Sequence, residues 1–291
     1  MKPPPFTYHA PDTLDEALAL LGEHGDEAKV LAGGQSLVPL LALRLARPSV
    51  LVDLRRVPGL SGIDATDGGV VFGAMTRERQ AERSDVVRKQ LPLLADALPL
   101  IGHVAIRTRG TIGGSVAHAD PAAELPAVAL ALDAELTAQS AARGPRPIAA
   151  ADFFEGFLST TLEPDEILVR VTFPTAKPGT GTAFTEAARR HGDFAIVGLA
   201  ASLTLSEGAI SDARLAFAGI SDVPVRAVDA EDLLVGQEPS AELFDEAARR
   251  ATDDIDPPAD LHGSSDYRRK VAAALVRRGL RAAAGNADER Q

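Results

Sequence analysis

Two glycine pairs, each with a serine close behind it, constrain most strongly how this chain can fold. Residues 32–36 read Ala-Gly-Gly-Gln-Ser after an apolar run, and residues 112–116 read Ile-Gly-Gly-Ser-Val. Glycine adopts positive φ without strain and lacks a Cβ, so successive N–H groups at such a pair can converge on an anion. The two segments either hold one diphosphate from both sides, as a dinucleotide requires, or form two unrelated tight turns.

The common glycine-rich nucleotide motifs are missing from both segments. Neither fits the G-x-G-x-x-G dinucleotide fingerprint or the G-x-x-x-x-G-K-S/T phosphate loop, and neither contains a lysine that would neutralise a γ-phosphate. The sequence therefore argues against nucleoside triphosphate hydrolysis.

The sequence contains no cysteine in its 291 residues, which excludes disulfides, thiolate nucleophiles and iron-sulfur clusters held by Cys on this chain. No two of its histidines have the i, i+4 spacing of helical metal ligands. We therefore expect neither a protein metal site nor a catalytic thiol. The histidines are His9, His24, His103, His118, His191 and His262.

The charge and the apolar runs exclude two further classes of partner. A formal net charge of −11 repels a nucleic-acid backbone. Pro39, Arg44 and Asp133 interrupt the longest apolar stretches before they reach the roughly 20 residues that cross a bilayer. Residues 1–5 read Met-Lys-Pro-Pro-Pro, unlike a secretory signal. We therefore expect a cytoplasmic protein that binds no nucleic acid and does not insert into a membrane.

Hydrophobic periodicity predicts a small β-α-β-like unit at the start and a hairpin after it. Residues 13–21 have helical spacing with Asp12 as the expected N-cap. Short apolar runs flanking Asp67-Gly68-Gly69 predict the hairpin. The predicted strands of this part are 29–32, 50–54, 60–63 and 70–72, and a short helix is expected over 37–45.

The remaining pattern predicts two α+β domains joined by a linker. With 45% apolar residues, the chain is long enough for two cores, and the Pro/Gly-rich residues 174–181 read as the boundary. The last helix has the pattern of a surface helix, with Val271, Leu275 and Leu280 near one stripe and the arginines Arg268, Arg269, Arg277, Arg278 and Arg281 elsewhere. Helices are expected at 77–83, 85–90, 93–101, 241–252 and 267–284, strands at 135–138, 167–173, 195–205 and 213–218, and a turn at 143–146.

Residues 111–126, Thr-Ile-Gly-Gly-Ser-Val-Ala-His-Ala-Asp-Pro-Ala-Ala-Glu-Leu-Pro, resemble the FAD-binding signature of the medium subunits of the xanthine dehydrogenase and carbon monoxide dehydrogenase family. Residues 32–37, 189–195 and 263–269 resemble further family segments, in the expected order. The resemblance implies an α+β fold, with a two-lobed FAD-binding domain of the vanillyl-alcohol-oxidase (PCMH) type and a smaller α+β C-terminal domain. The implied ranges are 1–175 (lobes about 1–56 and 57–175), 176–285 and a tail at 286–291.

The resemblance also implies a set of FAD contacts. The two glycine segments hold the diphosphate and the adjacent sugar, and Glu124 accepts hydrogen bonds from ribityl or ribose hydroxyls. Ile101 lies on the adenine side, and Leu168 and Ile196 lie at the isoalloxazine ring. The full set is Ala32, Gly33, Gly34, Gln35, Ser36, Leu37, Ile101, Thr111, Ile112, Gly113, Gly114, Ser115, Ala117, His118, Glu124, Leu168, Asp193 and Ile196.

Several of these residues have an alternative structural interpretation. Glu124 would also suit the first turn of a helix, where a negative charge is favourable. His118 satisfies loop carbonyls in the interpretation we favour, and the three apolar residues belong to the core by default. Ser115 stands where relatives often have asparagine, and Gln35 stands where some have histidine. Both residues keep a hydrogen-bond donor at their positions. Asp193, with the arginines before it, either steers an electron acceptor or forms a solvated ion-pair patch.

The function implied by the resemblance is electron transfer through non-covalently bound FAD, with no catalytic side chain required of this chain. The molybdenum cofactor and the 2Fe-2S clusters are expected on partner subunits, a large and a small one, in a dimer of heterotrimers. The absence of cysteine agrees with that division. A freestanding FAD oxidase or dehydrogenase and a flavinless scaffold are the two alternatives. Nothing in the chain selects the substrate or the terminal acceptor.

Overall fold

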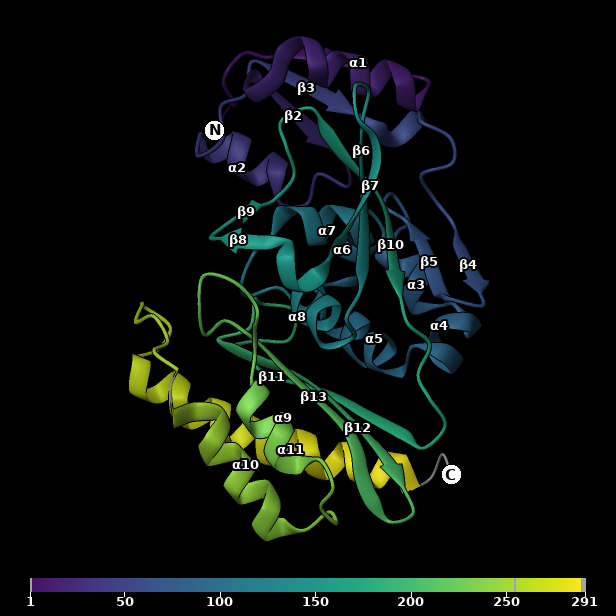
Figure 1. Cartoon of the computed structure of the whole chain (residues 1–291). Coiled ribbons are helices and arrows are strands. Elements are labelled where there is room, and N and C mark those ends of the chain that lie inside the picture. Colours follow the sequence, from purple (N-terminus) through teal and green to yellow (C-terminus); the bar gives the residue numbers. More distant parts are fainter. Residues whose placement is uncertain (1, 254, 289–291) are drawn as a thin grey trace.

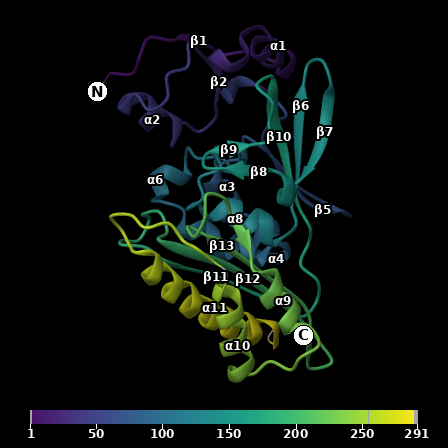
Figure 2. The same ribbon diagram turned by 60° about the vertical axis from the view of Figure 1, so that its left-hand side comes forward.

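The computed structural model describes residues 2–253 and 255–288. It is elongated, with a small N-terminal lobe at one end, a helix-rich second lobe in the middle and a C-terminal sheet with its helices at the other end (Figures 1 and 2). No helix of the described ranges has both the length and the apolar character needed to cross a membrane.

The first lobe is a parallel three-stranded sheet in the order β1-β3-β2. Helix α1 buries Ala17, Leu18 and Leu21. Thr13, rather than the predicted Asp12, is its N-cap, because the Thr13 side chain accepts a hydrogen bond from the Glu16 N–H at 3.2 Å. The elements are β1 (Thr7–His9), α1 (Leu14–His24), a 3₁₀ turn (Gly25–Glu27), β2 (Ala28–Leu31), α2 (Leu37–Leu43), β3 (Val50–Asp53) and a 3₁₀ turn (Leu54–Arg56).

The second lobe packs short helices against an antiparallel sheet in the order β4-β5-β10-β6-β7. Ile167 and Val169 of β10 join the first-lobe core, and Leu168 between them joins the second. Beyond the bulge between Leu168 and Arg170, where the alternation changes phase, Val171 and Phe173 also join the second-lobe core. One central strand thus serves both lobes. The strands are β4 (Ile63–Thr66), β5 (Gly69–Gly73), β6 (Glu135–Ser140), β7 (Gly144–Ala149), β10 (Glu166–Phe173) and a small hairpin of β8 (Phe154–Gly156) and β9 (Ser159–Thr160).

The helices of the second lobe lie between its sheet and the C-terminal domain. Helix α8 is buried on every side, because it packs against α5 and α7 of the second lobe and against β12 and β13 of the C-terminal domain. The helices are α3 (Glu78–Glu82), α4 (Asp85–Gln90), α5 (Pro92–Ala97), α6 (Val104–Arg107), α7 (Ile112–His118) and α8 (Glu124–Ala131), with 3₁₀ turns at Leu98–Leu100 and Ala150–Asp152.

The C-terminal domain is an antiparallel sheet in the order β11-β12-β13-β14, covered on both faces. Helices α5 and α8 of the second lobe pack on one face; α11 and α9 pack on the other, and α10 packs against these two helices. The chain is therefore α+β, as predicted. The elements are β11 (Thr180–Ala187), β12 (Val197–Ser206), β13 (Ala209–Ala218), β14 (Val225–Arg226), α9 (Val228–Leu234), α10 (Ala241–Asp253) and α11 (Ser265–Asp288).

Polar contacts fix the C-terminal domain on the second lobe. Asp133 accepts from Arg226 at 2.9 Å and from Arg214 at 3.3 Å. Thr182 donates to Asp96 at 2.8 Å, and the Gly219 N–H donates to the Pro121 carbonyl at 2.8 Å. The last of these bonds holds the turn after β13 against the segment that leads into α8, and the others join α5 and Asp133, just after α8, to the C-terminal sheet.

Several elements differ from the sequence-based expectations. The second glycine pair lies inside the first turn of α7, not in a loop ahead of a helix. Residues 144–146, expected as a turn, already belong to β7, and the linker ends where β11 begins at Thr180. Strand β11 and helix α9 were not predicted. Helix α11 continues to Asp288, into the predicted tail 286–291, of which residues 289–291 lie outside the described part.

Candidate cofactor-binding site

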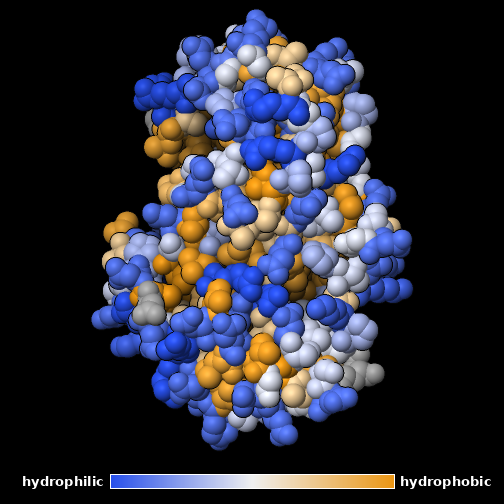
Figure 3. All heavy atoms as spheres, viewed as in Figure 1, coloured by the Kyte–Doolittle hydropathy of each residue, from blue (hydrophilic) through white to orange (hydrophobic). Residues whose placement is uncertain are grey.

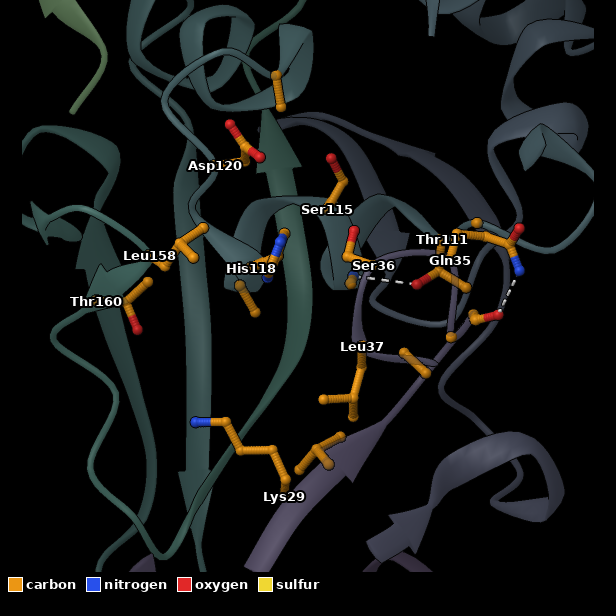
Figure 4. Close-up of a pocket in the computed structure, with 18 of the residues that line it drawn as sticks. Lys29, Gln35, Ser36, Leu37, Thr111, Ser115, His118, Asp120, Leu158 and Thr160 are labelled. Carbon is orange, nitrogen blue, oxygen red and sulfur yellow. Dashed lines mark hydrogen bonds between the residues drawn. The ribbon is translucent and has the colours of Figure 1, made fainter. Parts of the chain in front are cut away.

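A cleft of about 580 Å³ lies where the two lobes meet and extends to the loop that follows β11. Its walls come from the β2–α2 loop, α7, the β8–β9 hairpin and residues 192–194. Figure 4 shows side chains from these separate segments pointing into the same space. The volume lies in the range of sites that enclose cofactors.

The first glycine pair forms one wall, in the loop between β2 and α2. Gly34 has φ +73°, a conformation that side chains disfavour. A Cβ on Gly33 would lie 2.3 Å from the Arg109 carbonyl oxygen, so the two chain segments are in direct contact. Among the described residues, no acceptor faces the N–H groups of residues 33–37. Five consecutive free donors make this loop an anion-binding concavity.

The second glycine pair belongs to α7, which explains why its two glycines differ in role. Thr111, the N-cap, accepts a hydrogen bond from the Gly114 N–H at 3.0 Å, and Figure 4 marks this bond. Helical periodicity turns Ile112 and Gly113 toward the core, where a Cβ on Gly113 would lie 2.4 Å from that of Ala74. A Cβ on Gly114 would lie 3.2 Å from that of Ala32, so this glycine lets α7 approach the first loop.

Two buried carboxyl groups line the cleft, and a third lies behind them. Burial raises the pKa of Glu124 to about 8 and that of Glu78 to about 7. Burial also raises the pKa of Glu186, on β11, to about 7. Glu186, Glu78 and Asp120 each add to the rise at Glu124 through charge repulsion. Near neutral pH Glu124 is therefore mostly protonated, and Glu78 and Glu186 are only partly ionised.

From the raised pKa values of these three carboxyls we predict that the FAD-free chain loses stability as the pH rises from about 6 to 8.5. They keep their protons up to about pH 7 or 8 in the folded chain but only to about 4.5 when unfolded. The folded state thus binds more protons over this interval, and raising the pH favours unfolding. We expect the melting temperature to drop by on the order of 5 °C. Glu124→Gln should flatten the curve; a constant or rising melting temperature in the wild type would contradict the prediction.

Lys29 is the one fixed cation among the described residues that line the cleft. It lies on β2, just ahead of the first glycine pair, and its ammonium group points into the cleft (Figure 4). Burial lowers the pKa of His118, the other basic lining residue, despite the nearby Asp120. Lys29 was not among the predicted site residues. The sequence signal that could have found it is a lysine within a short apolar strand before a glycine pair.

The cleft brings most of the predicted site residues together. Ile112 and Gly113 face the core through helical periodicity, and Leu168 and Ile196 belong to the cores of the second lobe and the C-terminal domain. These four are not among the residues that line the cleft. The lining includes Ala32, Gly33, Gly34, Gln35, Ser36, Leu37, Ile101, Thr111, Gly114, Ser115, Ala117, His118, Glu124 and Asp193.

Sequence reasoning also missed the wall formed by the β8–β9 hairpin. Leu158, Ser159 and Thr160 line the cleft, and Glu78 lines it from the start of α3. No motif precedes the hairpin in the sequence, so only its fold against the glycine loops reveals it.

A long cleft with free N–H donors and a single lysine defines a class of protein, one that binds an extended anionic cofactor between two lobes.

Comparisons with known proteins identify that cofactor class. Residues 4–176 match the family described as FAD binding domain in molybdopterin dehydrogenase, and residues 182–283 match the CO dehydrogenase flavoprotein C-terminal domain. The chain belongs to this family of FAD-binding flavoproteins.

The relatives match the chain over nearly its whole length. The chain is 45% identical over 281 residues to the 6-hydroxypseudooxynicotine dehydrogenase complex subunit alpha of Paenarthrobacter nicotinovorans, covering 96% of this chain and 95% of that one. A carbon monoxide dehydrogenase structure from Hydrogenophaga pseudoflava aligns with a TM-score of 0.96 at 40% identity, covering 98% and 99%. Quinoline 2-oxidoreductase from Pseudomonas putida 86 aligns at 0.93 and 41%, covering 99% of both.

Proposed function

We propose that this chain is the FAD-containing electron-transfer subunit of a molybdenum hydroxylase complex. It receives electrons from an iron-sulfur partner and passes them to an external acceptor. The observation that carries the proposal is that the N–H groups of residues 33–37, in a loop that lines the cleft beside α7, have no hydrogen-bond acceptor among the described residues. These donors suit a diphosphate, and the family match supports FAD as its bearer.

Each part of the cleft has a role in holding FAD without a covalent bond. The N–H groups of residues 33–37 and the hydroxyls of Ser36 and Ser115 bind the diphosphate, and Lys29 offsets part of its charge. Glu124 accepts hydrogen bonds from sugar or ribityl hydroxyls. Bound FAD supplies exchange of one or two electrons, and the protein supplies its placement and electrostatic surroundings.

The partners we propose are a small iron-sulfur subunit and a large molybdenum subunit, in a dimer of heterotrimers in the cytoplasm. The relatives' names, such as "medium chain" and "complex subunit alpha", support such an assembly. A chain without cysteine needs a partner to hold iron-sulfur clusters. Val38, Leu43 and Leu45, on and just after α2, expose apolar side chains suited to a protein contact. Figure 3 shows apolar surface over this region.

We also propose the domain division 1–175, with lobes 1–56 and 57–175, and 176–285. The change from the sheet that ends with β10 at Phe173 to the one that begins with β11 at Thr180 supports this boundary. The gap between the two family matches, after residue 176 and before residue 182, supports it as well.

The visible spectrum of the purified chain tests the proposed function. We expect saturable uptake of FAD and absorption bands near about 370 and 450 nm, which report oxidised flavin. Co-purification from the native host should then recover a partner that contains iron and molybdenum. A chain that stays colourless with excess FAD would contradict FAD binding. Turnover of an organic substrate by the lone chain would instead favour a freestanding flavoenzyme.

A further inference from the structure

The carboxyl group of Glu78 has no hydrogen-bonding partner among residues 2–253 and 255–288. The residue begins α3 and lines the cleft, although it is only 3% exposed. Its Oε2 is buried without a partner, and no described residue donates to its Oε1. Burying a polar group without a hydrogen bond costs about 1–3 kcal/mol. Fold stability therefore does not account for a glutamate at this position.

The two nearest guanidinium groups are engaged elsewhere. Arg107 donates to Glu82 at 2.9 and 3.2 Å and to the Ile101 carbonyl at 2.8 Å. Arg77 donates to the Arg109 carbonyl. Both charges lower the pKa of Glu78, but burial is the larger effect and the net pKa is raised. A partner for the carboxyl must therefore come from outside the chain.

The position of Glu78 indicates which part of a dinucleotide would reach it. A Cβ on Gly110 would lie 2.4 Å from the Glu78 Oε2, and Gly110 adjoins Gly33, so the carboxyl lies next to the junction of the two glycine segments. The ionised form of Glu78 repels phosphate, and in either protonation state the carboxyl keeps an oxygen that accepts hydrogen bonds from O–H and N–H groups. Helix α3 packs against α6 and against the 3₁₀ turn before Ile101. Ile101 and Ile106 thus give this part of the cleft an apolar wall.

We propose that Glu78 determines specificity for the adenosine end of the cofactor, by accepting a hydrogen bond from the adenine amino group or a ribose hydroxyl. This proposal rests on the proposed function, since it requires FAD in the cleft. The contact distinguishes FAD from FMN, because FMN has no adenosine. Free ADP shares the contact, since it has the same adenosine and diphosphate.

The test measures flavin binding by the full chain, with wild type, Glu78→Met and Glu78→Asp compared. Methionine removes the acceptor, and aspartate withdraws it by one methylene while keeping the charge. We expect the affinity for FAD to fall about 10- to 100-fold with methionine and about tenfold with aspartate. Inhibition of FAD binding by ADP should weaken in parallel, and FMN affinity should stay within about twofold. The exposed Asp85→Asn, at the start of α4, is the control and should change nothing.

Thermal unfolding of the FAD-free variants supplies a second readout. Because Glu78→Met removes an unpartnered buried carboxyl, it should melt no lower than the wild type. If it unfolds instead, Glu78→Asp decides the question. Unchanged FAD affinity in a folded variant, or equal losses of FAD and FMN, would overturn the role of Glu78. Failure of the wild type to take up FAD would instead overturn the proposed function.

Discussion

Gly33→Val should leave the chain folded but unable to retain FAD, with an affinity at least about 100-fold below that of the wild type. The added Cβ would lie 2.3 Å from the Arg109 carbonyl oxygen and 2.9 Å from the Gly110 Cα. Both obstacles are backbone atoms, so a side-chain rotation cannot relieve the overlap. The β2–α2 loop must then move away from the segment that leads into α7, which separates the two walls that we propose hold the diphosphate.

Gly22→Val is the matched control for this experiment. Gly22 lies on the exposed side of α1, and a Cβ there meets no atom within 4 Å. Both variants add the same side chain, and neither glycine has the positive φ that would strain any substitution. FAD retention is read from absorbance after gel filtration, and folding from the melting temperature. If Gly33→Val kept its flavin, the glycine segments would not hold the cofactor as proposed.

The sequence predicts the glycine motifs well because their chemistry is local. A glycine pair after an apolar strand indicates a close backbone approach wherever the strand lies. Which atoms approach is a tertiary matter: Gly33 meets Arg109 and Gly110, far away in the sequence. The sequence also could not separate Gly113 from Gly114, because their roles depend on the helical phase of α7.

The apolar residues that were predicted to contact FAD show what local sequence patterns cannot predict. Leu168 and Ile196, expected at the flavin ring, belong to apolar cores and are not among the residues that line the cleft. Conversely, Glu78 and Lys29 lie in ordinary helix and strand patterns and enter the cleft only through tertiary packing. Periodicity predicts which face of an element is apolar, but not which neighbouring element covers it.

Arg268 differs most clearly from the sequence-based expectation. The helical pattern placed it away from the apolar stripe of a surface helix, but the structure buries its side chain. It is 5% exposed, and its Nη1 donates to the carbonyls of Ile196 and Gly219, while its Nη2 pairs with Asp260 at 2.7 Å. One side chain of α11 therefore fixes the start of β12, the turn after β13 and the loop before α11. Apolar periodicity cannot reveal a buried arginine whose partners are main-chain carbonyls.

Arg268→Met should accordingly destabilise the chain by about 3 kcal/mol, because two buried carbonyls lose the Arg268 donor and Asp260 loses its ion pair, although it still accepts from two backbone N–H groups. The Gly219 N–H bonds to Pro121, and Ile196 follows the loop that lines the cleft. We therefore expect weaker FAD retention as well. Arg278→Met, at an exposed position of the same helix, should change stability by less than about 0.5 kcal/mol. Denaturant unfolding measures both variants, and equal midpoints would show that the Arg268 bonds contribute little to the fold.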